Sequence, residues 1–153
     1  MVKVWFIHNS QAGNTERLSN QFADSLKSNY DVKVGSIDSI KPEDLANDNP
    51  DAIVFATRVE AFGSDRKMTE YVRSLGNVIK TPIPKVATFY THAMGWKKRF
   101  SKGMKKALEE STCIGETCPE FLELRLKGAK GPEREGQEDK TEQYLTMLKQ
   151  FIG

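Results

Sequence analysis

Short runs of apolar, β-branched residues alternate along this chain with stretches in which apolar residues recur every third or fourth position. The run at 52–56 is apolar throughout, as expected of a parallel strand covered on both faces. The segment 120–126 instead alternates apolar and polar residues, which favours a strand near a sheet edge. The pattern predicts five strands, at residues 2–8, 31–37, 51–57, 85–91 and 120–126.

Between these runs the apolar spacing is helical. Leu18, Phe22 and Leu26 recur every fourth residue, which places them on one face of a helix. A shorter helix is predicted at 40–47, with Pro42 near its start. The other helical periods are Met68, Tyr71, Val72 and Leu75; Phe100, Met104 and Leu108; and Tyr144, Leu145, Leu148, Phe151 and Ile152.

Strands that alternate with helices in this way predict an α/β fold with a parallel sheet and helices on both faces. Five strands in one small domain fit a three-layer, doubly wound sheet of order 2-1-3-4-5. The whole chain, 1–153, is expected to form one such domain, with 127–137 as a solvated loop.

Composition narrows the class of protein. With 38% hydrophobic and 29% charged residues, the chain is typical of a globular protein without a membrane span, and a cytoplasmic location is expected. A net charge of +2 gives no argument for nucleic-acid binding. Cys113 and Cys118 do not form a disulfide framework, and neither they nor His8 and His92 are spaced as metal ligands.

Function is expected at the carboxyl ends of the strands. In a sheet of this order, ligands bind where the first and third strands diverge, with the loop after the fourth strand beside them. Three loops therefore matter, at residues 9–15, 57–66 and 91–97.

The first loop has the features of an anion site. Ser10, Gly13 and Thr15 lie between a buried strand and the start of a helix, where backbone N–H groups and the helix dipole favour a phosphate. Gly13 lets the backbone approach the ligand closely, and the two hydroxyls are further donors. The alternative is that Thr15 caps the helix and Gly13 is an ordinary turn residue.

The segment Ser10-Gln11-Ala12-Gly13-Asn14-Thr15-Glu16 resembles the phosphate loop of the flavodoxins, Thr/Ser-x-Thr-Gly-x-Thr, and it follows the first strand as theirs does. The resemblance implies a non-covalently bound FMN, with Ser10 to Thr15 around its phosphate. Ala12 departs from the pattern, because flavodoxins usually have a hydroxyl there. The short gap before the final strand resembles the short-chain group.

The resemblance further implies that the second and third loops hold the flavin ring, commonly against an aromatic side chain. Phe62 and Trp96 are the available rings, although Trp96 also has the spacing to extend the apolar face of the next helix, four residues before Phe100. The expected cofactor-binding residues are Ser10, Gln11, Ala12, Gly13, Asn14, Thr15, Thr57, Arg58, Val59, Phe62, Gly63, Thr91, His92, Ala93, Gly95 and Trp96.

A basic segment follows the third loop, which departs from the acidic character of flavodoxin electron carriers. Its cations, with no acid among them, are Lys97, Lys98, Arg99, Lys102, Lys105 and Lys106. It is either a solvated helix face or a positive region beside the flavin. Positive charge at a helix start is unfavourable to the dipole, which favours a local role for Lys97 and Arg99.

No protein nucleophile or acid–base pair is evident in the sequence, as expected where a cofactor carries the chemistry. The leading prediction is an FMN-binding electron-transfer protein with redox partner proteins. One alternative is an NAD(P)H-dependent FMN or quinone reductase, and another is a cofactor-free interaction module of the same fold.

Overall fold

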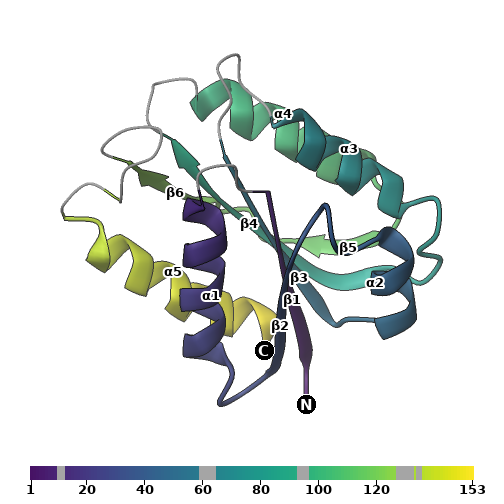
Figure 1. Cartoon of the computed structure of the whole chain (residues 1–153), viewed down its shortest axis with the longest axis horizontal. Helices are drawn as coiled ribbons and strands as arrows, with labels where there is room; N and C mark the ends of the chain where they lie inside the picture. Colours follow the sequence, from purple (N-terminus) through teal and green to yellow (C-terminus); the bar gives the residue numbers. More distant parts are fainter. Residues whose placement is uncertain (10–12, 59–64, 93–96, 127–132, 134–135) are drawn as a thin grey trace.

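The computed structural model of the chain describes residues 1–9, 13–58, 65–92, 97–126, 133 and 136–153, with the backbone alone at 97–101. Figure 1 shows that its strands form one twisted sheet with helices on both sides. The strands are β1 (Lys3–His8), β2 (Asp31–Ser36), β3 (Ala52–Arg58), β4 (Ile83–His92), β5 (Ile114–Thr117) and β6 (Leu122–Arg125). The helices are α1 (Asn14–Leu26), α2 (Pro42–Asp48), α3 (Arg66–Leu75), α4 (Lys97–Glu110) and α5 (Glu138–Ile152).

The sheet is parallel throughout, and its order is β2-β1-β3-β4-β5, with β6 also paired to β4. The register places Val4 opposite both Val32 and Ala52, so β1 runs between β2 and β3. This confirms the doubly wound 2-1-3-4-5 topology and all five helices expected from the apolar spacing.

The fifth position of the sheet differs from the single strand expected at 120–126. β5 pairs with the first part of β4, near Ile83, and β6 pairs with the last part, from Phe89 to His92. Pro119 lies in the break and has no N–H to donate to a ladder. Cys118 N still donates to Val86 O at 2.7 Å, which keeps the two halves in line along β4.

Each face of the sheet is covered by helices, which explains the continuously apolar strands. One core lies against α1 and α5, and Phe22, Phe89 and Tyr144 form ring contacts there. The other core lies against α2, α3 and α4. Figure 1 shows α1 and α5 together on one side and α3 with α4 on the other. Burying a large apolar side chain stabilises the fold by about 1.5–3 kcal/mol.

None of the helices in the described ranges is long and apolar enough to cross a membrane. The predicted solvated loop at 127–137 lies mostly outside the described residues. At its described end, Leu126 forms an isolated antiparallel bridge with Glu133, and Glu133 pairs with Arg17 of α1.

Candidate functional site

The parallel strands bring three chain segments to one edge of the sheet. β1 ends at His8, β3 at Arg58 and β4 at His92, and α1, α3 and α4 begin from the same side. Of the predicted site residues, the structure describes Gly13, Asn14, Thr15, Thr57, Arg58, Thr91 and His92. The remainder lie outside the described residues: Ser10, Gln11, Ala12, Val59, Phe62, Gly63, Ala93, Gly95 and Trp96.

Gly13 shapes the start of α1. It is the N-cap residue, with φ 83° and ψ −4° in the left-handed region, and no side chain caps this end within the described part of the chain. A Cβ on Gly13 would meet no described atom within 4 Å, so the space beside it is open. The first helical bond runs from Arg17 N to Gly13 O at 3.0 Å. The N–H groups of residues 14–16 therefore have no partner inside the helix and can bind an anion.

Thr15 is the second residue of α1 and Gly13 is the N-cap residue, so the expectation that Thr15 caps this helix is wrong. Its side chain is buried, and its hydroxyl donates to Asn9 O at 2.9 Å. A hydroxyl has one proton to donate. In this geometry Thr15 holds the first turn of α1 to the end of β1, while backbone N–H groups are the donors left for a ligand.

Asn14 carries an unsatisfied donor at the same turn. The residue is only 8% exposed, and among the described residues its buried Nδ2 has no acceptor. Its Oδ1 accepts a long bond of 3.4 Å from Arg17 Nη2. An unpaired buried donor costs about 1–3 kcal/mol. A phosphate oxygen at this turn would satisfy it, so the residues present fit the phosphate of a nucleotide cofactor.

Asp65 is a site residue that the sequence analysis missed. It is completely buried at the N-cap of α3, where its Oδ1 accepts from Met68 N at 3.3 Å. Asn9 Nδ2 donates to both carboxylate oxygens, at 2.9 and 2.8 Å, and Thr57 Oγ1 donates to Oδ2 at 2.7 Å. An aspartate three residues before the first apolar residue of a helical period is an N-cap signal that the sequence does contain.

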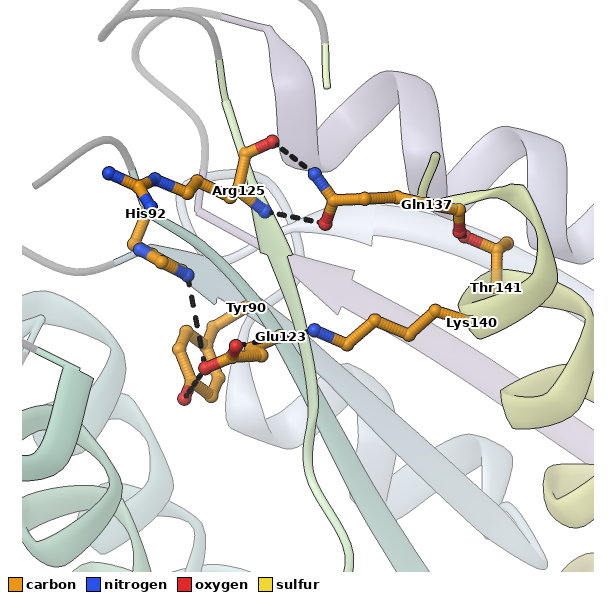
Figure 2. A network of polar contacts seen from close by, with 7 residues as sticks. All are labelled: Tyr90, His92, Glu123, Arg125, Gln137, Lys140 and Thr141. Atoms are coloured by element: carbon orange, nitrogen blue, oxygen red, sulfur yellow. Dashed lines mark hydrogen bonds and ion pairs between the residues drawn. The ribbon is translucent and has the colours of Figure 1, made fainter. Parts of the chain in front are cut away.

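The end of β4 lies in a second polar cluster, which Figure 2 shows in close-up. Thr91 and His92 are buried, and His92 Nε2 lies 3.8 Å from Glu123 Oε2. Tyr90 OH donates to the same carboxylate at 3.3 Å, and Lys140 Nζ approaches its Oε1 at 3.2 Å. The register explains the meeting, because β6 places Glu123 directly opposite Tyr90. The sequence analysis named His92 but neither Glu123 nor Lys140.

Gln137 fastens β6 to the start of α5. Its side-chain amide accepts from Arg125 N at 2.9 Å and donates to Arg125 O at 2.7 Å, as the backbone of a neighbouring strand would. Figure 2 shows both bonds beside the Glu123 cluster. Because Arg125 is opposite His92 in the register, this clamp supports the edge of the sheet next to the third loop.

Two basic features of the sequence are His8 and the basic segment of α4. Burial lowers the pKa of His8, at the end of β1, although the nearby Glu16 carboxylate acts in the opposite direction. In α4, Lys105 Nζ lies 5.4 Å from the Phe121 ring centroid, and Lys106 approaches Glu110 at 4.0 Å. The later part of the basic segment is thus an exposed helix face. The side chains of Lys97, Lys98 and Arg99 lie outside the described residues.

The cysteines do not approach this edge as a pair. Cys113 and Cys118 are free and buried, the first beside Ser111 and the second beside Met147. Burial raises the pKa of the Cys118 thiol. Within the described ranges, no three His, Cys, Asp or Glu side chains gather as metal ligands would.

The strand order defines a doubly wound α/β protein, and in such sheets ligands bind beyond the carboxyl ends of the strands, where the candidate site lies. More narrowly, the chain has the flavodoxin fold. It is similar to oxidised flavodoxin 2 from Bacillus cereus, with 18% identity and a TM-score of 0.76 over 97% of this chain and 99% of that one.

Two further structures show the same fold in different settings. A short-chain flavodoxin associated with a PDU bacterial microcompartment is 14% identical, with a TM-score of 0.66 over the full length of both chains. Rubredoxin oxygen:oxidoreductase from Desulfovibrio gigas is 12% identical, with a TM-score of 0.71 over 98% of this chain and 35% of that protein. The sequence matches no protein-family model and no curated protein.

Proposed function

We propose that this chain binds one FMN without a covalent bond and acts in electron transfer. The observation that carries the proposal is the start of α1, where Gly13 in the left-handed conformation opens the helix and the buried Asn14 amide lacks an acceptor among the described residues. The flavodoxin fold of the chain supports the same assignment. Bound FMN would supply the one- and two-electron chemistry.

The chain's own residues would bind and orient the cofactor. The N–H groups of residues 14–16 and the Asn14 amide would hold the phosphate at the positive end of the α1 dipole. Ser10, Gln11 and Ala12 complete that loop in the sequence. The loops 59–64 and 93–96 would contact the flavin ring, with Phe62 and Trp96 as the candidate aromatic contacts. Redox partner proteins and a cytoplasmic location remain part of this proposal.

Titration of the cofactor-free protein with FMN and with riboflavin tests the proposal. We expect micromolar or tighter binding of FMN, with a visible spectrum changed from that of free FMN, and much weaker binding of riboflavin. The difference arises because only FMN carries the phosphate that the α1 terminus would hold. Equal affinities would exclude the phosphate site, and no binding of either would favour a cofactor-free module.

A second candidate is an NAD(P)H-dependent reductase. It is favoured by the first turn of α4, which begins Lys97-Lys98-Arg99 and contains no acidic residue. Cations at this place would attract the phosphates of a nicotinamide nucleotide. Oxidation of NADH or NADPH in air by the FMN-loaded protein separates the two candidates, since a simple electron carrier shows no turnover without a reductase.

A further inference from the structure

We propose that Asp65 is a positioning residue for the first turn of α1, the candidate phosphate site, which it holds in place through Asn9. The ligand in this proposal rests on the proposed function, whereas the geometry does not. Asp65 is the N-cap residue of α3 and is far in sequence from the start of α1 at Gly13 and Asn14. Its carboxylate joins three elements, because its hydrogen-bond donors come from the ends of β1 and β3 and from α3 itself.

Capping α3 does not require these extra bonds. An N-cap aspartate needs one acceptor oxygen for a backbone N–H of the first turn and can remain in water. Asp65 has that bond, to Met68 N, yet it is completely buried and accepts from Asn9 and Thr57 as well. Burying a carboxylate is costly unless it is paired or fully hydrogen-bonded. The additional bonds connect Asp65 to the carboxyl ends of β1 and β3, where the candidate site lies.

The described partners of Asp65 suit a carboxylate that acts as an acceptor. Each of the described contacts of the Asp65 carboxylate is a donor: the Asn9 amide, the Thr57 hydroxyl and the Met68 N–H. An ionised carboxylate is an acceptor only, so it matches all of them. The described residues offer Asp65 no cation, and the positive end of α3 supplies the compensating charge.

The same hydrogen bonds connect Asp65 to the end of β1 and to the first turn of α1. Asn9 is fixed by its backbone N–H, which donates to Ala56 O at 3.0 Å, and by its side chain on Asp65. Its carbonyl accepts from the Thr15 hydroxyl in the first turn of α1. Asn9 and Gly13 flank residues 10–12 in the sequence. The bonds between Asp65 and Asn9, and between Thr15 and Asn9, therefore fix the first turn of α1 relative to the end of β1.

Three substitutions separate positioning from capping. Asn9→Ala removes the hydrogen bonds between Asn9 and Asp65 but leaves the Asp65 bonds to Met68 N and Thr57. Asp65→Ala removes the bonds to Asn9 and also the N-cap of α3. Asp65→Asn keeps an oxygen that can accept from Met68 N. Its amide N–H can donate to the oxygen of a flipped Asn9 side chain, so the link between residues 9 and 65 is kept. Asp44→Ala is the matched control, because it removes a carboxylate that accepts from Lys41 N at the start of α2, outside the site.

The measured quantity is the ratio of FMN affinity to riboflavin affinity, which isolates the phosphate. We expect this ratio to fall about tenfold in Asn9→Ala and Asp65→Ala, the loss that a misplaced set of phosphate donors causes. It should stay within about threefold of the parent in Asp65→Asn and Asp44→Ala. A ratio unchanged in Asn9→Ala, with only the melting temperature lowered in Asp65→Ala, would show that Asp65 is an ordinary N-cap and overturn the proposal.

Amide hydrogen exchange in the absence of flavin makes the test independent of cofactor binding. Asn9→Ala should raise the exchange rate at the first amides bonded within α1, from Arg17 onward, while Asp44→Ala should leave it unchanged. If the parent binds no flavin but this exchange response occurs, the proposed function fails and the positioning role stands. If flavin binds and Asn9→Ala changes neither exchange nor the affinity ratio, the positioning role fails alone.

Discussion

The two ends of the parallel sheet carry different kinds of polar chemistry. At the carboxyl end, Asn9, Thr57 and Asp65 are buried, and both Asn9 and Thr57 donate to the Asp65 carboxylate. At the amino end the polar contacts are largely solvent-exposed ion pairs, such as Lys85 with Glu116. Exposed pairs contribute about 0–1 kcal/mol each, whereas a buried polar group is costly unless its bonds are made. The difference teaches that the buried polar groups of Asn9, Thr57 and Asp65 depend on their bonds within the protein, whereas exposed ion pairs at the amino end can exchange their partners for water.

Asp48 shows how the amino end tolerates its charges. Its carboxylate accepts from Trp5 Nε1 at 2.7 Å and from Lys33 Nζ at 3.2 Å, with Lys3 Nζ at 3.7 Å. The lysine side chains are roughly half exposed, so water can replace them as partners. Asp65 at the other end has no such alternative, because no part of it reaches solvent.

The largest effect that tests this comparison is expected from Gly13→Val. A β-branched side chain at φ 83° is strained by about 1–3 kcal/mol, and it fills the open space where the phosphate would lie. We expect FMN affinity to fall by about a hundredfold or more, since each 1.4 kcal/mol is tenfold. Flavin titration measures the loss, and circular dichroism checks that the fold is kept.

Gly136→Val is the matched control for that prediction. Gly136 has φ 84° before α5, and a Cβ there would also meet no described atom within 4 Å. Both variants should therefore lose similar stability from backbone strain, but only Gly13→Val should lose FMN. An equal loss of FMN in the two variants would mean that the general strain, and not the site, is responsible.

A smaller effect is expected at the start of α4, from the triple substitution of Lys97, Lys98 and Arg99 to Gln. If these cations lie near the flavin, they favour its anionic, fully reduced form. Charges about 4 Å apart in water interact by about 1 kcal/mol, and about 1.4 kcal/mol corresponds to 59 mV for a one-electron step. The potential of the second reduction step should fall by tens of millivolts in the variant, as measured by a stepwise reductive titration.

The control variant removes three positive charges at the opposite end of the molecule, where the parallel strands begin. Lys27, Lys80 and Lys149 are exposed and lie at the C-terminal end of α1, after α3 and near the end of α5. Their triple substitution to Gln should leave the potential close to that of the parent, because salt screens distant exposed charges. Equal shifts in both triple variants would place the α4 cations on a remote, solvated surface.

The sequence predicted well those features that depend on local periodicity. The apolar strands and the spacing of Leu18, Phe22 and Leu26 correctly predicted which residues are buried. The alternation of strands and helices then left few possible sheet topologies. The sequence analysis missed the break in the fifth strand, although Pro119 marks it. β5 is short and only partly buried, so it has no strong apolar pattern from which a separate strand could be predicted.

The candidate site was less predictable than the fold. A phosphate loop has a local signature, so residues 10–15 could be proposed as such a loop from the sequence alone. The bonds from Asn9 to Asp65 and from Tyr90 to Glu123 join residues that are 56 and 33 positions apart. Such pairs are set by strand register and helix placement, which a one-dimensional pattern does not contain. A buried polar network can therefore be recognised only after the topology is known.

The smallest effect is expected from Asp48→Asn, at the amino end. Asparagine keeps an oxygen for the Trp5 indole but removes the charge that faces Lys33 and Lys3. The loss of stability at neutral pH should be at most about 1 kcal/mol, or about 2–4 °C in melting temperature for a chain of this size. FMN affinity should not change, because the site lies at the opposite end of the sheet.

The pH dependence of stability sharpens this last prediction. The Trp5 indole hydrogen bond, aided by Lys33 and Lys3, outweighs burial and holds the pKa of the Asp48 carboxyl below its usual range. A carboxyl whose folded pKa is depressed stabilises the fold above its unfolded pKa, about 3.9, and loses that contribution as pH falls through the folded pKa. Thermal melts of the parent and Asp48→Asn should therefore differ at pH 6 and converge as the pH is lowered below 4. A difference that instead grows on acidification would show that the charge of Asp48 does not stabilise the folded chain.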